Sequence, residues 1–470
     1  MLKRLANSTV VWSWILNGLR AGSGLIIFSL LWHKLSTSEF GMSGVLLQLA
    51  SMALIFDFGF GPTIDRFVAY AMAGTEKLEA IGLSQPAERK EPNYLLLWEL
   101  LVTTRKLYRY LTVALFFTFG IGGTLLIENL VRRETAIHPD FSGSMSRLAW
   151  AVTLVATMLD IYSNWWAIYL RGMNQIRTAV KLTVLAMTVR LVLATALLLW
   201  GAGLLSVPLA GIVSSFIQRH FTRVKCLQLL PPAPPIGRMD LRKSFAVLWP
   251  NSWRHGVQLA SSFLIIQLNT FVCAHVFHLG ISGQYTASVQ LMGYASSMAA
   301  VWTMVKWPLI GQYQVSRDYA SIQHLLWSRV WLQIFTFAVL AGGVIFVMPG
   351  FLHWIGKDKE LLPLPWLLAL AVNNFLEMLL ATSGTLIATG NRLPFIWHSV
   401  LSNLLSLLLS LSLLRFTQLG PGALVAGPML AGCIFNYWYW PAYAARSIQT
   451  TLFRFLFFGP AKKKLGSLGV

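Results

Sequence analysis

The sequence predicts an all-α integral membrane protein with about twelve transmembrane helices in two six-helix lobes. Its 470 residues are 56% hydrophobic and only 11% charged, whereas soluble domains carry about 25% charged residues, so much of the surface must face lipid. Apolar windows also recur along the chain. Each has about 18 to 27 residues, enough at 1.5 Å per residue to cross roughly 30 Å of hydrocarbon.

The apolar windows can be placed in order along the chain. The first, from about 10 to 32, is longer than the apolar region of a signal peptide and lacks a small-residue cleavage pattern, so we expect a retained helix. The others lie at roughly 40–66, 107–128, 148–170, 178–200, 203–221, 252–277, 282–307, 327–348, 364–388, 393–414 and 421–444.

The basic residues predict the orientation of these helices. If the N-terminus lies inside, the inner loops carry most of the 37 Lys and Arg residues. The positive-inside rule then predicts a multi-pass protein of the cell membrane with both termini in the cytoplasm and an even number of spans.

The chain repeats itself weakly but in order. Residues 14–27 resemble residues 253–266, and Asn174 aligns with Asn391 in the corresponding turn of the second half. Two halves that cross the membrane in the same direction predict a pseudo-twofold axis along the membrane normal. We therefore expect an N-terminal lobe over 1–222, a proline-rich cytoplasmic linker over 223–243 and a C-terminal lobe over 244–470 with a short basic tail.

Composition and spacing disfavour several other classes of protein. The net charge of +20 is spread over loops rather than gathered on one face, so nucleic-acid binding is not expected. The cysteines Cys226, Cys273 and Cys433 show neither zinc nor disulfide spacing, and the histidines show no ligand spacing. We expect no metal and no cofactor. The outer connections are too short for a catalytic domain, so we expect a protein that is not an enzyme.

Single charges lie near the middle of several apolar windows, where charge is costly and marks a route for ions or substrate. They are Arg20, Asp160, Arg190 and Glu377. We therefore expect a polar interior, and the sign of these charges guides the choice of cargo.

Three motifs carry a family resemblance. Residues 35–41 (Leu-Ser-Thr-Ser-Glu-Phe-Gly), residues 57–71 (beginning Asp-Phe-Gly-Phe-Gly-Pro) and residues 170–175 (Leu-Arg-Gly-Met-Asn-Gln) resemble the polysaccharide-exporting and O-antigen flippases. These move lipid-linked oligosaccharides and share a superfamily with multidrug and toxin extruders and lipid II flippases. The second half lacks a counterpart of the Asp-x-Gly motif that ends the second window.

The resemblance implies translocation of an isoprenoid-diphosphate-linked oligosaccharide across the cytoplasmic membrane for surface polysaccharide biosynthesis, by alternating access. Its partners would be that cargo, membrane lipids and glycan polymerase machinery. A cationic groove can replace the hydration of a diphosphate. Two alternatives stay open: a cation-coupled multidrug extruder with an acidic cavity, and a membrane glycan polymerase or ligase, which the short outer loops disfavour.

The candidate substrate contacts are basic or polar residues of three windows. Asn17 and Arg20 share one face of the first helix, near mid-membrane, and Arg190 and Arg254 complete the expected anion site. Alternatives remain: a carboxylate such as Asp57 neutralises Arg20, or Arg254 extends to the interface as an anchor.

The carboxylates within the apolar windows are the coupling-ion candidates: Asp57, Asp160 and Glu377. Asp160 lies at the depth of Arg190, so an intramembrane ion pair is the competing interpretation. Glu377 has no cation at equal depth in its half; it either carries a proton or makes a structural hydrogen bond.

Overall fold

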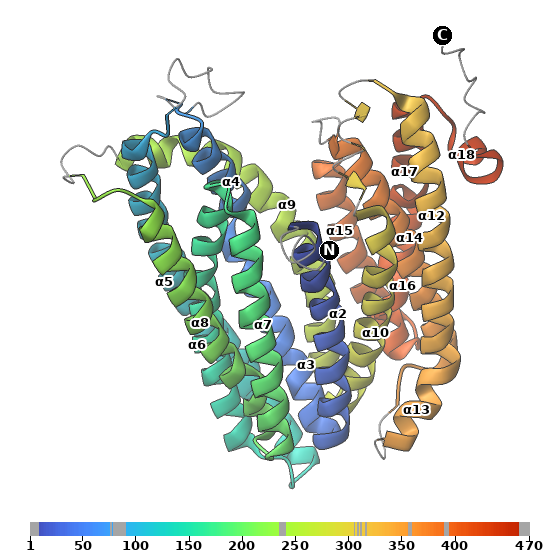
Figure 1. Ribbon diagram of the computed structural model, residues 1–470. Helices are drawn as coiled ribbons and strands as arrows, with labels where there is room; N and C mark the ends of the chain where they lie inside the picture. Colours follow the sequence, from blue (N-terminus) through green and yellow to red (C-terminus); the bar gives the residue numbers. More distant parts are fainter. Residues whose placement is uncertain are drawn as a thin grey trace. The chain divides into compact units, whose positions relative to one another are not determined.

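A computed structural model describes residues 9–75, 78, 91–234, 241–304, 306–307, 310, 313–314, 317–355, 360–389 and 394–459. Within these residues the regular structure is entirely helical (Figure 1). Seven of the described helical segments are long and apolar enough to cross a membrane by length and mean hydropathy.

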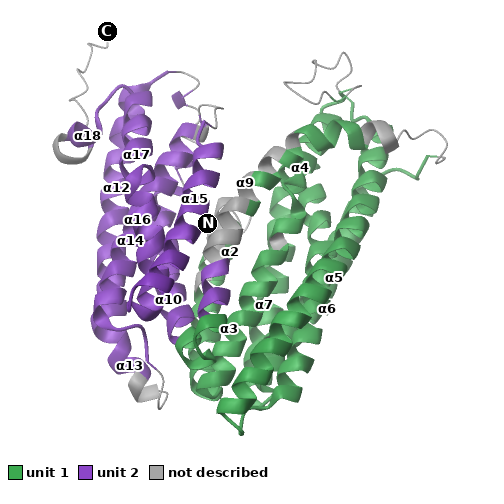
Figure 2. Ribbon diagram, turned by 180° about the vertical axis from the view of Figure 1, so that it is seen from behind, with its two compact units in different colours: residues 1–267, 274–283 green, residues 268–273, 284–470 purple. Residues whose placement is uncertain are grey.

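The chain divides into two compact units, 1–267 with 274–283, and 268–273 with 284–470 (Figure 2). The first unit contains α2 (Thr9–Lys34), α3 (Thr37–Met52), α4 (Phe60–Met72), α5 (Tyr94–Ile137), α6 (Gly143–Gly172), α7 (Ile176–Leu199), α8 (Ser206–Leu229) and most of α9 (Leu241–Val276). The second contains most of α10 (Leu279–Met304), and α12 (Tyr319–Gly342), α13 (Met348–Ile355), α14 (Leu364–Thr389), α15 (Ile396–Phe416), α16 (Ala423–Ile434), α17 (Asn436–Ser447) and α18 (Leu452–Phe458). The lobe boundaries predicted from the sequence stay a prediction.

Within the described residues, each predicted window falls on one helix or on successive helical segments. The window 40–66 falls on α3 and α4, and the window 421–444 falls on α16 and α17. The window 107–128 is only part of α5, which has 44 residues.

The break between α3 and α4 has a backbone cause. Phe58 and Gly59 both have positive φ, 48° and 69°, which ends a short 3-10 turn (Ala53–Asp57) before α4 begins. Glycine adopts this conformation without the steric cost that other residues incur. The Asp-Phe-Gly-Phe-Gly motif is therefore a helix break that leaves the Asp57 side chain at the start of α4.

A second quoted motif also has a local role. The Glu39 N–H donates to Ser36 Oγ (3.2 Å), and the Ser36 N–H donates to Glu39 Oε2 (3.0 Å). This reciprocal capping box satisfies two backbone donors at the start of α3.

The core of the first unit forms around α6, which packs against α4, α5, α7 and α8. Buried aromatic side chains fill it, among them Phe60, Phe67, Trp165 and Tyr169. The Tyr169 hydroxyl donates to the Leu97 carbonyl at 2.6 Å, which satisfies a polar group inside this core.

In the second unit, α14 packs against α17, and α15 packs against α16. The core includes Leu326, Val330, Leu386 and Trp440. Phe435, with φ −143° and ψ −52°, separates α16 from α17. This break turns the aromatic run that begins α17 onto α14.

Candidate transport site

Arg20 lies in the middle of α2 with an exposed side chain. Among the described residues no carboxylate lies within 4.0 Å of its guanidinium group, so the alternative in which Asp57 neutralises Arg20 is not formed there. The side chains of the other predicted contacts on α2 and α9, Asn17 and Arg254, lie outside the described residues.

Asp57 is held by groups of its own unit. The Tyr108 hydroxyl donates to Asp57 Oδ1, and the Gly61 N–H donates to Oδ2 at 3.2 Å. Gly61 also allows this approach, because a Cβ there would lie 3.0 Å from Asp57 Oδ2. Asp57 therefore accepts a hydrogen bond from the first turn of α4 and ties this helix to α5.

Asp160 and Arg190 form the intramembrane ion pair that was the competing interpretation. Arg190 Nη1 lies 3.6 Å from Asp160 Oδ2, and the Ser215 hydroxyl donates to Asp160 Oδ1. Gly211 lies beside the arginine, and a Cβ there would lie at an ordinary contact distance, 3.6 Å, from Arg190 Nη2. The pair joins α6, α7 and α8, which leaves Arg190 less suited to hold an anionic cargo.

Glu377 differs from the other two carboxylates. Its side chain is exposed on α14, and within the described part of the chain no Lys, Arg or His lies within 4.0 Å of it. The Tyr437 hydroxyl lies 2.8 Å from Glu377 Oε1 and 2.8 Å from Asn373 Oδ1. A hydroxyl has one proton, so it donates to only one of these oxygens at a time.

Sequence reasoning missed Tyr437, which reaches Glu377 only because α17 turns back after Phe435. Gly432 makes room for its ring, because a Cβ there would overlap Tyr437 Cζ. The aromatic run after Gly432 is visible in the sequence, but nothing in the sequence shows that it faces Glu377.

Tyr437 also lines a narrow apolar pocket of about 90 Å³ in the second unit. Aliphatic residues of α12, α14 and α17, among them Val330, Leu379 and Ala444, form much of its wall. Close by in the sequence, Phe435 and Tyr439 stack with ring centroids 4.4 Å apart, and Tyr439 meets Trp440 edge to face at 5.0 Å. Apolar walls, and a carboxylate that is hydrogen-bonded to the pocket residue Tyr437, together suit an organic cation.

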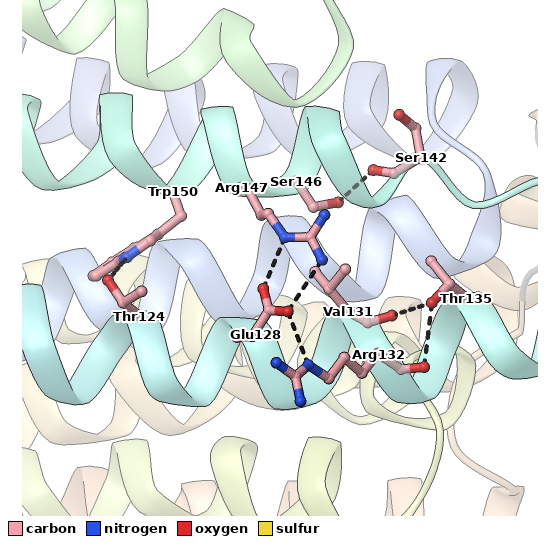
Figure 3. Close-up of polar contacts among 9 residues, drawn as sticks. All are labelled: Thr124, Glu128, Val131, Arg132, Thr135, Ser142, Ser146, Arg147 and Trp150. Carbon is pink, nitrogen blue, oxygen red and sulfur yellow. Dashed lines mark hydrogen bonds and ion pairs between the residues drawn. The ribbon is translucent and has the colours of Figure 1, made fainter.

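The C-terminal end of α5 carries a separate polar network, shown in Figure 3. Glu128 accepts from Arg132 Nε (2.9 Å) and from Arg147 Nε (2.7 Å), and Trp150 Nε1 donates to Thr124 Oγ1 at 3.0 Å. The contacts of Arg147 and Trp150 join α5 to α6, whereas Arg132 pairs within α5, and both arginines are exposed. We assign them a structural role.

No protein-family model matches this chain, and no curated protein sequence matches it. Solved structures do. An inward-facing multidrug resistance MATE family transporter of the MOP superfamily has a TM-score of 0.63 at 12% identity, over 94% of this chain and 99% of that chain. A point mutant of the Vibrio cholerae MATE transporter VcmN has a TM-score of 0.58 at 14% identity, over 95% of this chain and 98% of that chain.

A third structure, a ligand complex of the MATE multidrug transporter DinF-BH, has a TM-score of 0.59 at 12% identity, over 95% of this chain and 96% of that chain. This protein therefore has the fold of MATE transporters along nearly its whole length. The predicted class, an all-α, two-lobe membrane protein, is confirmed. At such identities the likeness establishes the fold and not the cargo.

Proposed function

We propose that this chain is a membrane exporter that works by alternating access and exports an amphipathic organic cation. Two observations support the mechanism: the shared fold, and the description of two of the similar structures as inward-facing and outward-facing. Rocking between such states is how lobed transporters expose one site to each side of the membrane in turn. The protein would be a transporter rather than an enzyme.

The observation that carries the cargo class is the environment of Glu377. Charge at this depth is costly, so a carboxylate without a basic partner among the described residues needs a proton or a cation. Tyr437 offers it one neutral hydrogen bond and also lines the apolar pocket. A cationic group would pair with the carboxylate while an apolar substituent enters the pocket.

Glu377 is also the best of the three coupling-ion candidates. Asp160 already has the guanidinium of Arg190, and Asp57 already accepts two hydrogen bonds. Binding of a proton or of the cation at Glu377 would exclude the other, which is the simplest arrangement for exchange across the membrane.

The test is efflux of a fluorescent organic cation from proteoliposomes that contain the full-length protein and carry a proton gradient. We expect Glu377→Gln to lower the efflux rate about tenfold or more, because loss of one member of a charge pair commonly costs over about 1.4 kcal/mol. The control is Glu360→Gln, an exposed glutamate before α14, which should transport normally. Normal efflux by Glu377→Gln, or none by the wild-type protein, would refute the proposal.

A second candidate function is the flipping of a lipid-linked oligosaccharide, which the motif resemblance implies and Arg20 favours. Arg20 is exposed and lacks a carboxylate partner among the described residues, and a planar guanidinium suits a diphosphate. Arg190 no longer supports this cargo because it is paired. The glycan polymerase partner stays a prediction.

Paired variants separate the two cargoes. In cells that make surface glycan, Arg20→Ala should abolish export if the cargo is a diphosphate, whereas Arg132→Ala, on the exposed end of α5, should not. Loss of cation efflux in Glu377→Gln with normal glycan export in Arg20→Ala supports the extruder. The opposite pair of results supports the flippase.

A further inference from the structure

Two arginines of the first unit gather around one tyrosine. The Arg219 guanidinium carbon of α8 lies 4.1 Å from the ring centroid of Tyr162 on α6. Arg105 of α5 and Arg219 both interact with the Tyr162 hydroxyl. Neither arginine has a carboxylate within 4.0 Å in the part of the chain that the structure describes.

This arrangement brings two like charges together without a neutralising carboxylate among the described residues. Arg105 is exposed and Arg219 is half-buried, so an outside group can reach both charges, and one phenol oxygen offers them a dipole rather than a charge. Long arginine side chains that only sought water would extend apart toward the interface. Their convergence on one hydroxyl therefore favours an anion as the missing component.

The predicted depth of this cluster in the membrane indicates which class of anion it binds. Arg105 lies just before the predicted window 107–128, and Arg219 lies near the end of the predicted window 203–221. The predicted orientation places both at the cytoplasmic headgroup level. Basic pockets between helices at this level suit the headgroups of anionic lipids, and guanidinium groups donate paired hydrogen bonds to phosphate oxygens.

We propose that Arg105, Arg219 and Tyr162 form a binding site for a lipid-borne phosphate in the cytoplasmic leaflet. This site is separate from Glu377 and does not depend on the proposed function. The phosphate has two possible sources: an anionic phospholipid of the bilayer or an isoprenoid diphosphate. The shared requirement is a phosphate with net negative charge on an apolar anchor.

The experiment measures lipid binding to the purified full-length protein in an uncharged detergent, by native mass spectrometry. The probes are phosphatidylglycerol, an isoprenyl diphosphate and the matching isoprenol without phosphate. We expect the wild-type protein to bind at least one of the phosphate-bearing probes and not the isoprenol, and Arg105→Gln/Arg219→Gln to weaken that binding about tenfold or more. Preference for the first probe identifies a bilayer lipid, and preference for the second identifies a carrier lipid.

The matched control is Lys106→Gln/Arg223→Gln, which removes two exposed positive charges from the same two helices. It should bind as the wild-type protein does. Equal weakening in the control pair would mean non-specific surface charge, and normal binding by Arg105→Gln/Arg219→Gln would exclude these residues; either result overturns the proposal. If the double variant does not fold, Arg105→Gln alone must still weaken binding several-fold.

Discussion

Asp160 and Arg190 show how single residues make charge tolerable within the apolar part of this chain. The two charges neutralise each other, and the Ser215 hydroxyl donates a hydrogen bond to the carboxylate. Glu377 and Arg20 have no such charged partner among the described residues. The apolar windows therefore hold two kinds of charged residue: those that pair with each other in the structure, and those that can bind cargo or a coupling ion. Only their neighbouring side chains show which kind each residue is.

The Asp160 and Arg190 side chains should be energetically coupled. We expect Asp160→Asn and Arg190→Gln each to lower the thermal stability of the purified protein, because each leaves an unpaired charge. The double variant should recover part of that loss, giving a coupling energy of about 1 kcal/mol, since both side chains are partly exposed. If the two losses of stability simply add in a double-mutant cycle, the two side chains are not energetically coupled and the prediction is wrong.

At the scale of elements, the end of α5 holds the turn between α9 and α10. Glu134 is 2% exposed; its carboxylate accepts from the Ser38 hydroxyl (2.5 Å) and from the Leu279 N–H (3.2 Å) at the start of α10. Arg133 Nη1 donates to the His275 carbonyl at 2.5 Å. Two consecutive residues thus satisfy the end of one helix and the start of the next.

Removing the Glu134 carboxylate should therefore loosen this turn. We expect Glu134→Ala to lower the free energy of unfolding by about 1–3 kcal/mol, because the buried donors it serves are left unsatisfied. Arg132→Ala, two residues away and exposed, should change it by less than about 0.5 kcal/mol. Thermal unfolding in detergent measures both, and equal stabilities would contradict the assignment.

The contact between α3 and the start of α10 also depends on a glycine. A Cβ at Gly41 would overlap the Leu279 carbonyl oxygen, whereas a Cβ at Gly22 of α2 would meet no atom within 4 Å. Gly41→Ala should lower the melting temperature, and Gly22→Ala should leave it unchanged or raise it through helix propensity of up to about 1 kcal/mol. A Gly41→Ala protein as stable as the wild type would show that the two helices can separate at no cost.

At the scale of the whole molecule, the orientation of the chain in the membrane is a direct prediction of its charge distribution. Asp140 lies in a predicted outer connection and Pro232 in a predicted inner one, and both are exposed. In a variant without the native cysteines, of which Cys433 is exposed, Asp140→Cys should react with an impermeant maleimide in intact cells. Pro232→Cys should react only after permeabilisation. The reverse pattern would invert the topology.

The helical windows were predictable because hydropathy reports lipid exposure directly, without knowledge of tertiary contacts. The breaks at Phe58 and Phe435 were not predicted, since each window has the length and hydropathy of one continuous span and the breaks depend on local φ and ψ angles. The partnership of Asp160 with Arg190 could be anticipated from equal depth, whereas the hydrogen bond from Tyr437 to Glu377 could not. It depends on a turn of the backbone and on the absence of a side chain at Gly432.

The length of α5 has a mechanical consequence. Its 44 residues span about 66 Å at 1.5 Å per residue, roughly twice the hydrocarbon thickness, so the helix extends well beyond the bilayer core. It is one continuous helix, and if it moves as a rigid body, a pivot of about ten degrees about its midpoint would carry each tip through about 6 Å. Small reorientations inside the lipid are thereby amplified into displacements at the water-exposed ends.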